Sequence, residues 1–225
     1  MKNVVFIFLL ISIVSYSQET KKSDPAESRM LGQTIRNTNR SNNKVKGSPY
    51  VQQMFAVAKV ENITQKSIMR YNVFDDQFEF ISTTSDTLIM DKNPDFSPIV
   101  FSGTNKKYQL TQYTNNTGKL FYGYLIHLYE KGDFALLKKE NIIFYEEKPA
   151  KTSLEVTQPA RFTKVGDTWF LKNKDKVSEF PESKKQLIKL FPDHKMAIET
   201  FVKENKISFD IESDQVKLVN FVSAL

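Results

Sequence analysis

The chain has 225 residues, 40% of them hydrophobic, and it contains no cysteine, which excludes disulfides, thiolate metal sites and a cysteine nucleophile. Of the formal net charge of +6, residues 19–48 contribute seven Lys or Arg against three Asp or Glu, and residues 49–225 carry only +1. A nucleic-acid-binding protein carries its positive charge on a face of the folded domain. We therefore expect no nucleic-acid partner.

The first 17 residues have the pattern of a secretory signal peptide. Lys2 precedes an apolar run from Val4 to Val14, and Ser15-Tyr16-Ser17 places small residues before a cleavage site at Gln18. The run is too short for a transmembrane helix, which needs roughly 20 apolar residues, and no other stretch qualifies. We expect an exported protein that is periplasmic, envelope-associated or extracellular, with no transmembrane segment in the mature chain.

Residues 18–48 are rich in Lys, Arg, Ser, Thr and Asn, with few apolar positions. Such a composition buries too little apolar surface to offset the entropy of ordering, so it predicts a disordered basic linker. A basic arm can also make weak contacts with anionic surfaces.

Residues 49–180 have the alternating pattern of β-strands. Short candidate strands with turn residues between them follow one another without an intervening helical pattern, which favours an antiparallel meander closed as a barrel, roll or sandwich. The candidates are 54–60, 66–73, 78–82, 87–91, 98–102 and 107–113.

The most apolar part of this region is residues 120–145. It predicts a hairpin buried on both faces, with a turn at Gly132-Asp133. A second hairpin is predicted from Arg161 to Leu171, with its turn at Gly166-Asp167.

From Pro181 onwards the apolar period changes to that of helices. Ser183, Asp193 and Ser213 are candidate N-caps of three short helices, and Val219, Val222 and Leu225 are candidate inward-facing residues of the last. The predicted fold class is therefore α+β: an antiparallel β-meander over 49–180, followed by a small helical segment over 181–225 that packs on the sheet.

Three groups of residues carry a family resemblance. They are Gly47-Ser48-Pro49-Tyr50, the stretch Arg70-Tyr71-Asn72-Val73-Phe74-Asp75-Asp76-Gln77-Phe78-Glu79, and the helical tail around 187–206. Together they resemble a group of uncharacterised secreted proteins of Bacteroidota, with Gln77 where an acidic residue is more usual. The resemblance implies a periplasmic or envelope location and no particular activity.

Catalytic candidates are few. His127 and His194 lie in no catalytic motif, and adjacent Asp75 and Asp76 are typical of a turn. With few glycines and no phosphate loop, we expect no enzyme, no cofactor and no metal site.

Binding candidates are easier to find. Aromatic residues of the predicted sheet, among them Tyr122, Tyr124, Tyr129 and Trp169, form a platform for glycan or peptide if they face outward, and are core residues if they face inward. Asp86-Thr87-Leu88 is similar to an O-glycosylation acceptor of Bacteroidota, which makes Thr87 a candidate modification site.

The sequence therefore favours a non-enzymatic envelope protein that binds another envelope component, either a protein or a glycan. The alternatives are a carrier of a small hydrophobic ligand inside a barrel and an enzyme whose site has no familiar motif.

Overall fold

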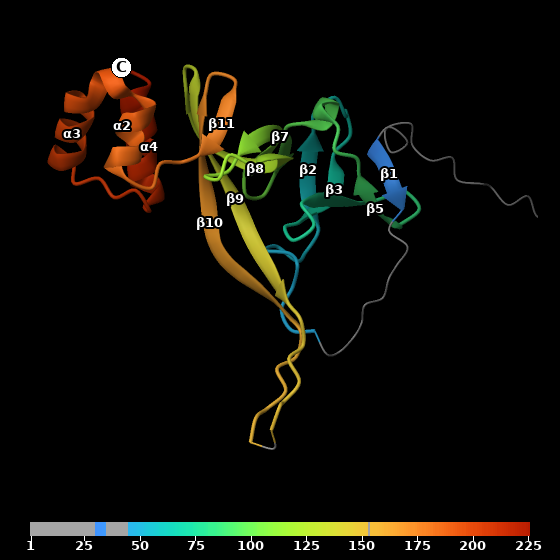
Figure 1. Ribbon diagram of the computed structural model, residues 1–225. Coiled ribbons are helices and arrows are strands. Elements are labelled where there is room, and N and C mark those ends of the chain that lie inside the picture. Colours follow the sequence, from blue (N-terminus) through green and yellow to red (C-terminus); the bar gives the residue numbers. More distant parts are fainter. Residues whose placement is uncertain (1–29, 35–44, 153) are drawn as a thin grey trace, which may run out of the picture.

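The computed structural model describes residues 30–34, 45–152 and 154–225, so the signal-peptide prediction over 1–17 lies outside it. One antiparallel-rich sheet is followed by three α-helices (Figure 1). This confirms the predicted α+β class and the order of meander and helices. The strands are β1 (Leu31–Thr34), β2 (Ala56–Val60), β3 (Ser67–Asn72), β4 (Gln77–Ile81), β5 (Thr87–Met90), β6 (Ile99–Phe101), β7 (Lys107–Thr114), β8 (Leu120–Lys131), β9 (Phe134–Tyr145), β10 (Arg161–Asn173) and β11 (Lys176–Glu179).

The first part of the sheet is a twisted meander. Its order is β1-β5-β4-β3-β2-β6-β7, with antiparallel pairing throughout. Phe78 and Phe80 of β4 are buried here beside Tyr71 of β3. Burial of these large side chains accounts for the strand alternation in the sequence.

The second part closes on itself. β7 pairs antiparallel with β8, and the strands β8, β9, β10 and β11 then continue round until Ser178 of β11 pairs in parallel with Thr114 of β7. Side chains fill the inside of this ring, including buried Tyr113, Leu125 and Phe170.

The hairpin predicted over 120–145 is present as β8 and β9. Leu125, Leu136 and Leu137 at its centre are buried, whereas Leu120 and Ile143 near its ends are exposed. The prediction of burial on both faces is therefore correct only for the centre. Beyond it, β9 and β10 continue as a long two-stranded arm that projects from the body (Figure 1).

Three α-helices follow the sheet: α2 (Lys184–Leu190), α3 (Lys195–Glu204) and α4 (Glu212–Val222). Short 3-10 turns lie at Pro94–Phe96 and Pro192–His194. Ser183 is the N-cap of α2, and its hydroxyl accepts a hydrogen bond from Gln186 N. The other two cap predictions are wrong: Asp193 lies in the preceding 3-10 turn and Ser213 lies inside α4, whose N-cap is Ile211.

The helices pack against the sheet through one apolar cluster. Leu187, Ile198, Leu218, Val219 and Val222 meet Leu136 and Leu171 of the sheet there. Leu225, predicted to face inward, is instead exposed because the helix ends at Val222. Among the described helices none combines the length and the apolarity that crossing a membrane requires.

The prediction of one disordered linker over 18–48 is wrong for its described residues. β1 pairs with β5, Met30 is buried in the core, and Lys46 pairs with Arg161 of β10. Main-chain pairing at a sheet edge needs no apolar composition, which is why the composition of the segment gave no sign of it.

Two of the motifs that carry the resemblance lie against each other. Tyr50 Oη donates to Glu79 Oε1 at 2.7 Å, and Arg70 Nη2 lies 2.6 Å from Glu79 Oε2. The Arg70 guanidinium also stacks 3.9 Å above the Tyr50 ring. Burial and the neighbouring Glu79 raise the pKa of the Tyr50 hydroxyl, so this phenol stays protonated and donates to the carboxylate.

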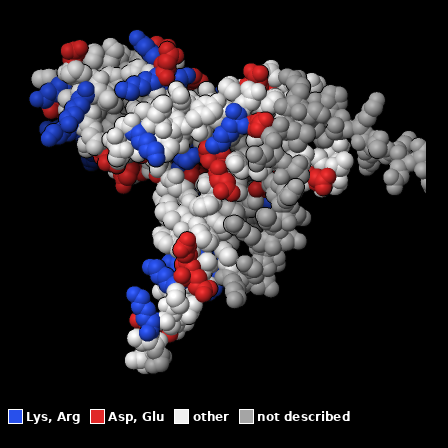
Figure 2. Space-filling view, turned by 45° about the vertical axis from the view of Figure 1, so that its right-hand side comes forward, with Lys and Arg blue, Asp and Glu red and all other residues white. Residues whose placement is uncertain are grey.

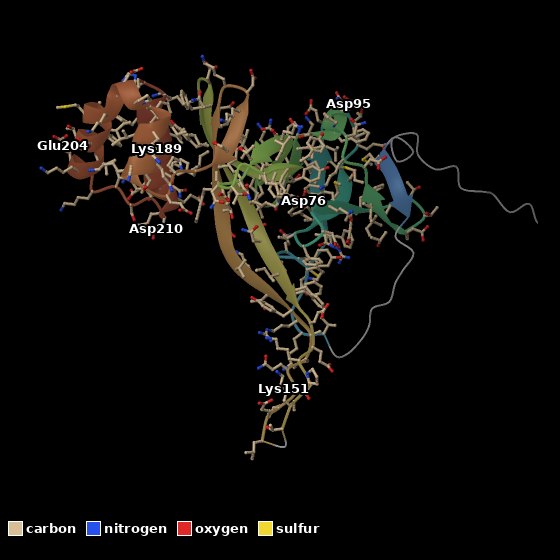
Figure 3. The ribbon with its side chains drawn as sticks, in the orientation of Figure 1. Asp76, Asp95, Lys151, Lys189, Glu204 and Asp210 are labelled. Atoms are coloured by element: carbon tan, nitrogen blue, oxygen red, sulfur yellow. The ribbon has the colours of Figure 1, made fainter. Side chains whose placement is uncertain are left out.

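Asp76 connects the two parts of the sheet (Figure 3). Its carboxylate accepts a short hydrogen bond from Tyr71 Oη and lies 2.6 Å from Lys92 Nζ and 3.0 Å from Lys139 Nζ. It also accepts the Tyr124 N–H at 3.2 Å. The turn predicted for Asp75-Asp76 is therefore present, and its second carboxylate has a structural role that a turn motif does not indicate.

Candidate functional site

A cavity of about 620 Å³ lies between the closed part of the sheet and the helices. This volume is within the range of small-molecule sites in proteins. Its wall combines the turn after β7, strands β10 and β11, helix α2, the segment before α4, and α4 itself. The residues used below are Asn116, Asp167, Thr168, Trp169, Glu179, Glu182, Gln186, Lys189, Phe209, Asp210 and Gln215.

A β-bulge in β10 positions one side of the cavity. Val165 pairs with Asn141 and Thr168 pairs with Lys139, so Gly166 and Asp167 together oppose a single residue of β9. The hairpin predicted with a turn at Gly166-Asp167 is therefore wrong: β10 runs through these residues, and its partner is β9. A Gly-Asp pair fits both a turn and a bulge, and the chain on either side decides between them.

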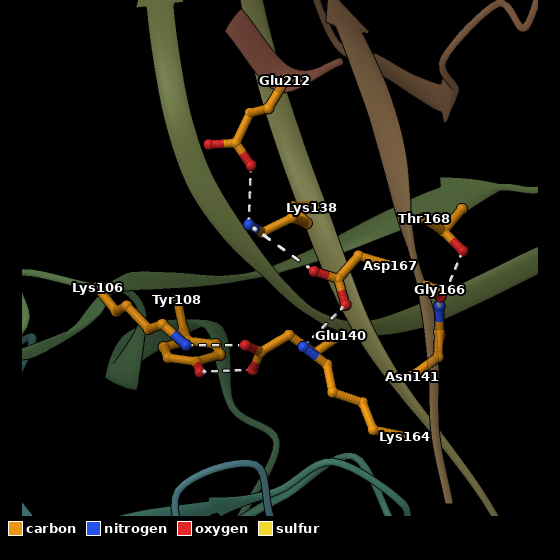
Figure 4. Close-up of polar contacts among 10 residues, drawn as sticks. All are labelled: Lys106, Tyr108, Lys138, Glu140, Asn141, Lys164, Gly166, Asp167, Thr168 and Glu212. Carbon is orange, nitrogen blue, oxygen red and sulfur yellow. Dashed lines mark hydrogen bonds and ion pairs between the residues drawn. The ribbon is translucent and has the colours of Figure 1, made fainter. Parts of the chain in front are cut away.

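The bulge is held by Asn141. Its Nδ2 donates to the Gly166 carbonyl oxygen at 2.8 Å and to Thr168 Oγ1 at 2.9 Å (Figure 4). This bonding fixes the backbone on both sides of Asp167, and it places Asp167, Thr168 and Trp169 in the cavity wall. Bulges commonly redirect side chains next to functional sites.

Asp167 is mostly buried and incompletely neutralised. Its carboxylate lies 3.9 Å from Lys138 Nζ and 3.7 Å from Lys164 Nζ, both longer than a hydrogen bond, and 18% of the side chain is exposed (Figure 4). Lys138 makes its close contact, 2.9 Å, with Glu212 of α4 instead. Asp167 therefore keeps unused accepting capacity at the cavity.

Unpartnered polar atoms gather in this wall. In the part of the chain that the structure describes, four buried side-chain atoms lack a hydrogen-bond partner, and three of them are Asp167 Oδ1, Trp169 Nε1 and Gln215 Oε1. The fourth, Tyr124 Oη, lies in the sheet core. Leaving such a group unpaired costs about 1–3 kcal/mol, so each calls for an explanation.

The Gln215 and Trp169 residues are held in place by other contacts, although one polar side-chain atom of each has no partner. Gln215 is 2% exposed, and its Nε2 donates to the Phe209 carbonyl oxygen at 2.7 Å. Trp169 packs among the apolar side chains between sheet and helices, and its carbonyl oxygen accepts the Phe180 N–H at 2.8 Å. The wall is thus preformed, with one buried donor and two buried acceptors unused among the described residues.

The rim of the cavity is acidic. Glu179 Oε2 accepts the Asn116 N–H at 2.6 Å, and Glu182 and Asp210 contribute two more carboxylates. The Ser208 hydroxyl donates to Asp210 and lowers the pKa of that carboxyl. It is therefore ionised at neutral pH, and Lys189 is the cation of the wall.

The structure separates the four predicted aromatic residues. Tyr122 is exposed on β8, whereas Tyr124 is 2% exposed and belongs to the core, where burial and the Asp76 charge raise the pKa of its hydroxyl. Tyr129 packs beside α4, and its hydroxyl donates to Asn220 Oδ1 at 3.3 Å. They form no common platform, and of the four only Trp169 lies in the cavity wall.

Thr87 is the first residue of β5 and is half-buried, and the following Leu88 is buried. This placement leaves the modification hypothesis untested.

The two histidines lie on different elements, His127 in β8 and His194 in the 3-10 turn before α3. His127 Nε2 lies 3.2 Å from Glu130 Oε2, and burial lowers the pKa of its imidazole. His194 ends the 3-10 turn before α3. Among the described residues, no group of three His, Cys, Asp or Glu side chains is arranged to hold a metal ion.

Sequence reasoning missed Asp167, Glu179 and Gln215 as a set. They come from a bulge, a four-residue strand and a helix interior, and no local motif connects them. The lone tryptophan was the one available signal, because an indole combines a large apolar surface with a donor.

No protein-family model, curated protein or solved structure matches the chain.

Proposed function

We propose that this protein is an exported, non-enzymatic envelope protein that binds a glycan in the cavity between its sheet and its helices. The observation that carries the proposal is the Trp169 side chain, whose indole N–H is unpartnered, in a wall that also contains the unpartnered side-chain oxygen of Gln215. Sugars combine apolar ring faces with many hydroxyl groups. An indole and side-chain amides or carboxylates complement those two features.

The two unused acceptors and one unused donor also suit hydroxyl groups, which can donate and accept. Covered polar atoms are reached only when a ligand displaces neighbouring side chains, and the rim residues Glu182 and Lys189 have exposed side chains. The carrier hypothesis has less support, because the closed ring of strands is filled by its own side chains.

Trp169 is the only tryptophan of the chain, so its fluorescence reports directly on the cavity. The test is a fluorescence titration of the mature protein with cellotetraose, maltotetraose and tetra-N-acetylchitotetraose. We expect a saturable change with at least one of these glycans. The matched variants are Gln215→Leu, which keeps the side-chain size and removes the accepting oxygen, and Tyr122→Phe on the exposed part of β8.

Gln215→Leu should weaken binding by about 10-fold, which corresponds to about 1.4 kcal/mol for a lost ligand hydrogen bond. Tyr122→Phe should leave binding unchanged. Absence of a saturable change with every glycan, or equal weakening by both variants, would contradict the proposal.

A further inference from the structure

The charge of the cavity wall is unbalanced. Four carboxylates line it, from Asp167, Glu179, Glu182 and Asp210, against the single ammonium group of Lys189. Figure 2 shows basic side chains spread over the helical segment, with acidic side chains along its lower edge and also at its top. The negative charge of the cavity is therefore local and differs from the net charge of the chain.

Neighbouring cations offset this charge only in part. Lys138 makes its shortest contact, 2.9 Å, with Glu212, and it lies 3.9 Å from Asp167. Lys164 lies 3.7 Å from the same carboxylate and is half-exposed, so solvent screens its side of the pair. Asp167 Oδ1 therefore has no hydrogen-bond donor among the described residues.

The accepting groups exceed the donating groups as well. Gln215 Oε1 is unpartnered and almost fully buried, and the exposed Glu182 carboxylate forms no hydrogen bond or ion pair with the described residues. Trp169 Nε1 is the one buried side-chain donor without a partner among the described residues of the wall. A ligand that completes this wall must supply mainly N–H or O–H donors and at least one positive charge.

We propose that the glycan bound in this cavity carries a protonated primary amine, as in an amino sugar without its acetyl group. The inference rests on the proposed glycan binding and adds the charge of the ligand. An ammonium group supplies three donors and one charge, which match an ionised carboxylate at hydrogen-bond distance. An N-acetylated sugar of the same length supplies neither the charge nor the three donors.

The test compares chitotetraose with tetra-N-acetylchitotetraose, which differ only in the acetyl groups on nitrogen. Binding of each is measured by Trp169 fluorescence at a pH where the amine is protonated. We expect chitotetraose to bind at least 10-fold more tightly, and we expect this preference to fall with added salt, because screening weakens interactions between partly exposed charges.

The variants Asp167→Asn and Glu182→Gln should each reduce the preference several-fold and change binding of the acetylated sugar little. Asp167 is partly buried, so thermal melting of Asp167→Asn establishes that it folds; Glu182 is exposed, and its substitution leaves the packing unchanged. The matched control is Glu204→Gln on α3. This substitution removes one negative charge, as the other two do, but from the side of the helical segment that faces away from the sheet (Figure 3).

The outcomes separate the two proposals. Binding of neither sugar would overturn glycan binding itself. Equal binding of both would overturn only the requirement for an amine. A preference that survives Asp167→Asn and Glu182→Gln, or that Glu204→Gln reduces equally, would show that overall charge and not the cavity wall is responsible, and would also overturn this inference.

Discussion

Gly123 of β8 lies so close to Asp76 that a Cβ atom at this position would be 2.2 Å from Asp76 Oδ2. The absence of a side chain lets the carboxylate reach the N–H of the next residue, Tyr124, at 3.2 Å. The same carboxylate holds Lys92 and Lys139. Glycine at this position therefore allows the β3–β4 turn to be fastened across the sheet to β8 and β9.

The first prediction follows from this contact. Gly123→Ala should lower the free energy of unfolding by roughly 1–3 kcal/mol, because the added methyl group must displace Asp76 from its partners. Urea denaturation measures the change. Gly103→Ala is the matched control, since no heavy atom lies within 4 Å of a Cβ there; equal losses for both variants would contradict the proposed contact.

The second prediction concerns Met30. Its side chain is 2% exposed in the core, so Met30→Ala should cost about 2–5 kcal/mol of stability. Met54, with 77% exposure, provides a control that should change by less than about 0.5 kcal/mol. If Met30→Ala were as mild as Met54→Ala in thermal melting, the strand Leu31–Thr34 would not be docked on β5 in solution.

The third prediction compares two leucines of β8. Leu125 is fully buried inside the closed ring, and Leu125→Ala should cost about 2–5 kcal/mol because it leaves a cavity there. Leu120, near the end of the strand, is exposed, and its substitution should be nearly neutral. The urea concentration at the midpoint of unfolding measures both changes. Similar midpoints for the two variants would contradict the packing of Leu125 inside the closed ring.

The fourth prediction concerns pH. Burial and the charge of Lys107 lower the pKa of His127 below its usual 6.5, Lys172 adds to this effect, and Glu130 opposes it. The unfolded chain therefore binds a proton at this imidazole more readily than the folded chain does. The contribution of His127 to the free energy of unfolding is fully present above pH 6.5 and declines as the pH falls below that value. His127→Gln should flatten this decline in melting temperature, whereas His194→Gln should leave it in place; a steeper decline for His127→Gln would show the opposite shift.

Much of the fold could be predicted from the sequence where the signal is local. Phe78 and Phe80 alternate with Glu79 as a strand requires, and Ser183 precedes an apolar helical stripe. The apolar centre of 120–145 predicts a hairpin with a buried centre for the same reason. Each of these patterns depends on neighbours within a few residues.

Features that depend on distant residues could not be predicted. Gly166-Asp167 has turn chemistry, and only the continuous pairing of β10 with β9 makes it a bulge. The four contacts of Asp76 come from residues up to 63 positions away. The cavity is a further example, because its wall unites Asn116 with Gln215, and no window of the sequence contains both.

The span of this wall has a thermodynamic consequence. A ligand that touches both the turn after β7 and helix α4 can bind only while the helices are docked on the sheet, so it opposes their release by mass action. Saturating ligand should therefore slow amide hydrogen exchange in Glu212–Val222 more than in the distant meander strand Ser67–Asn72. A bound ligand would therefore stabilise the docked position of the C-terminal helices on the sheet.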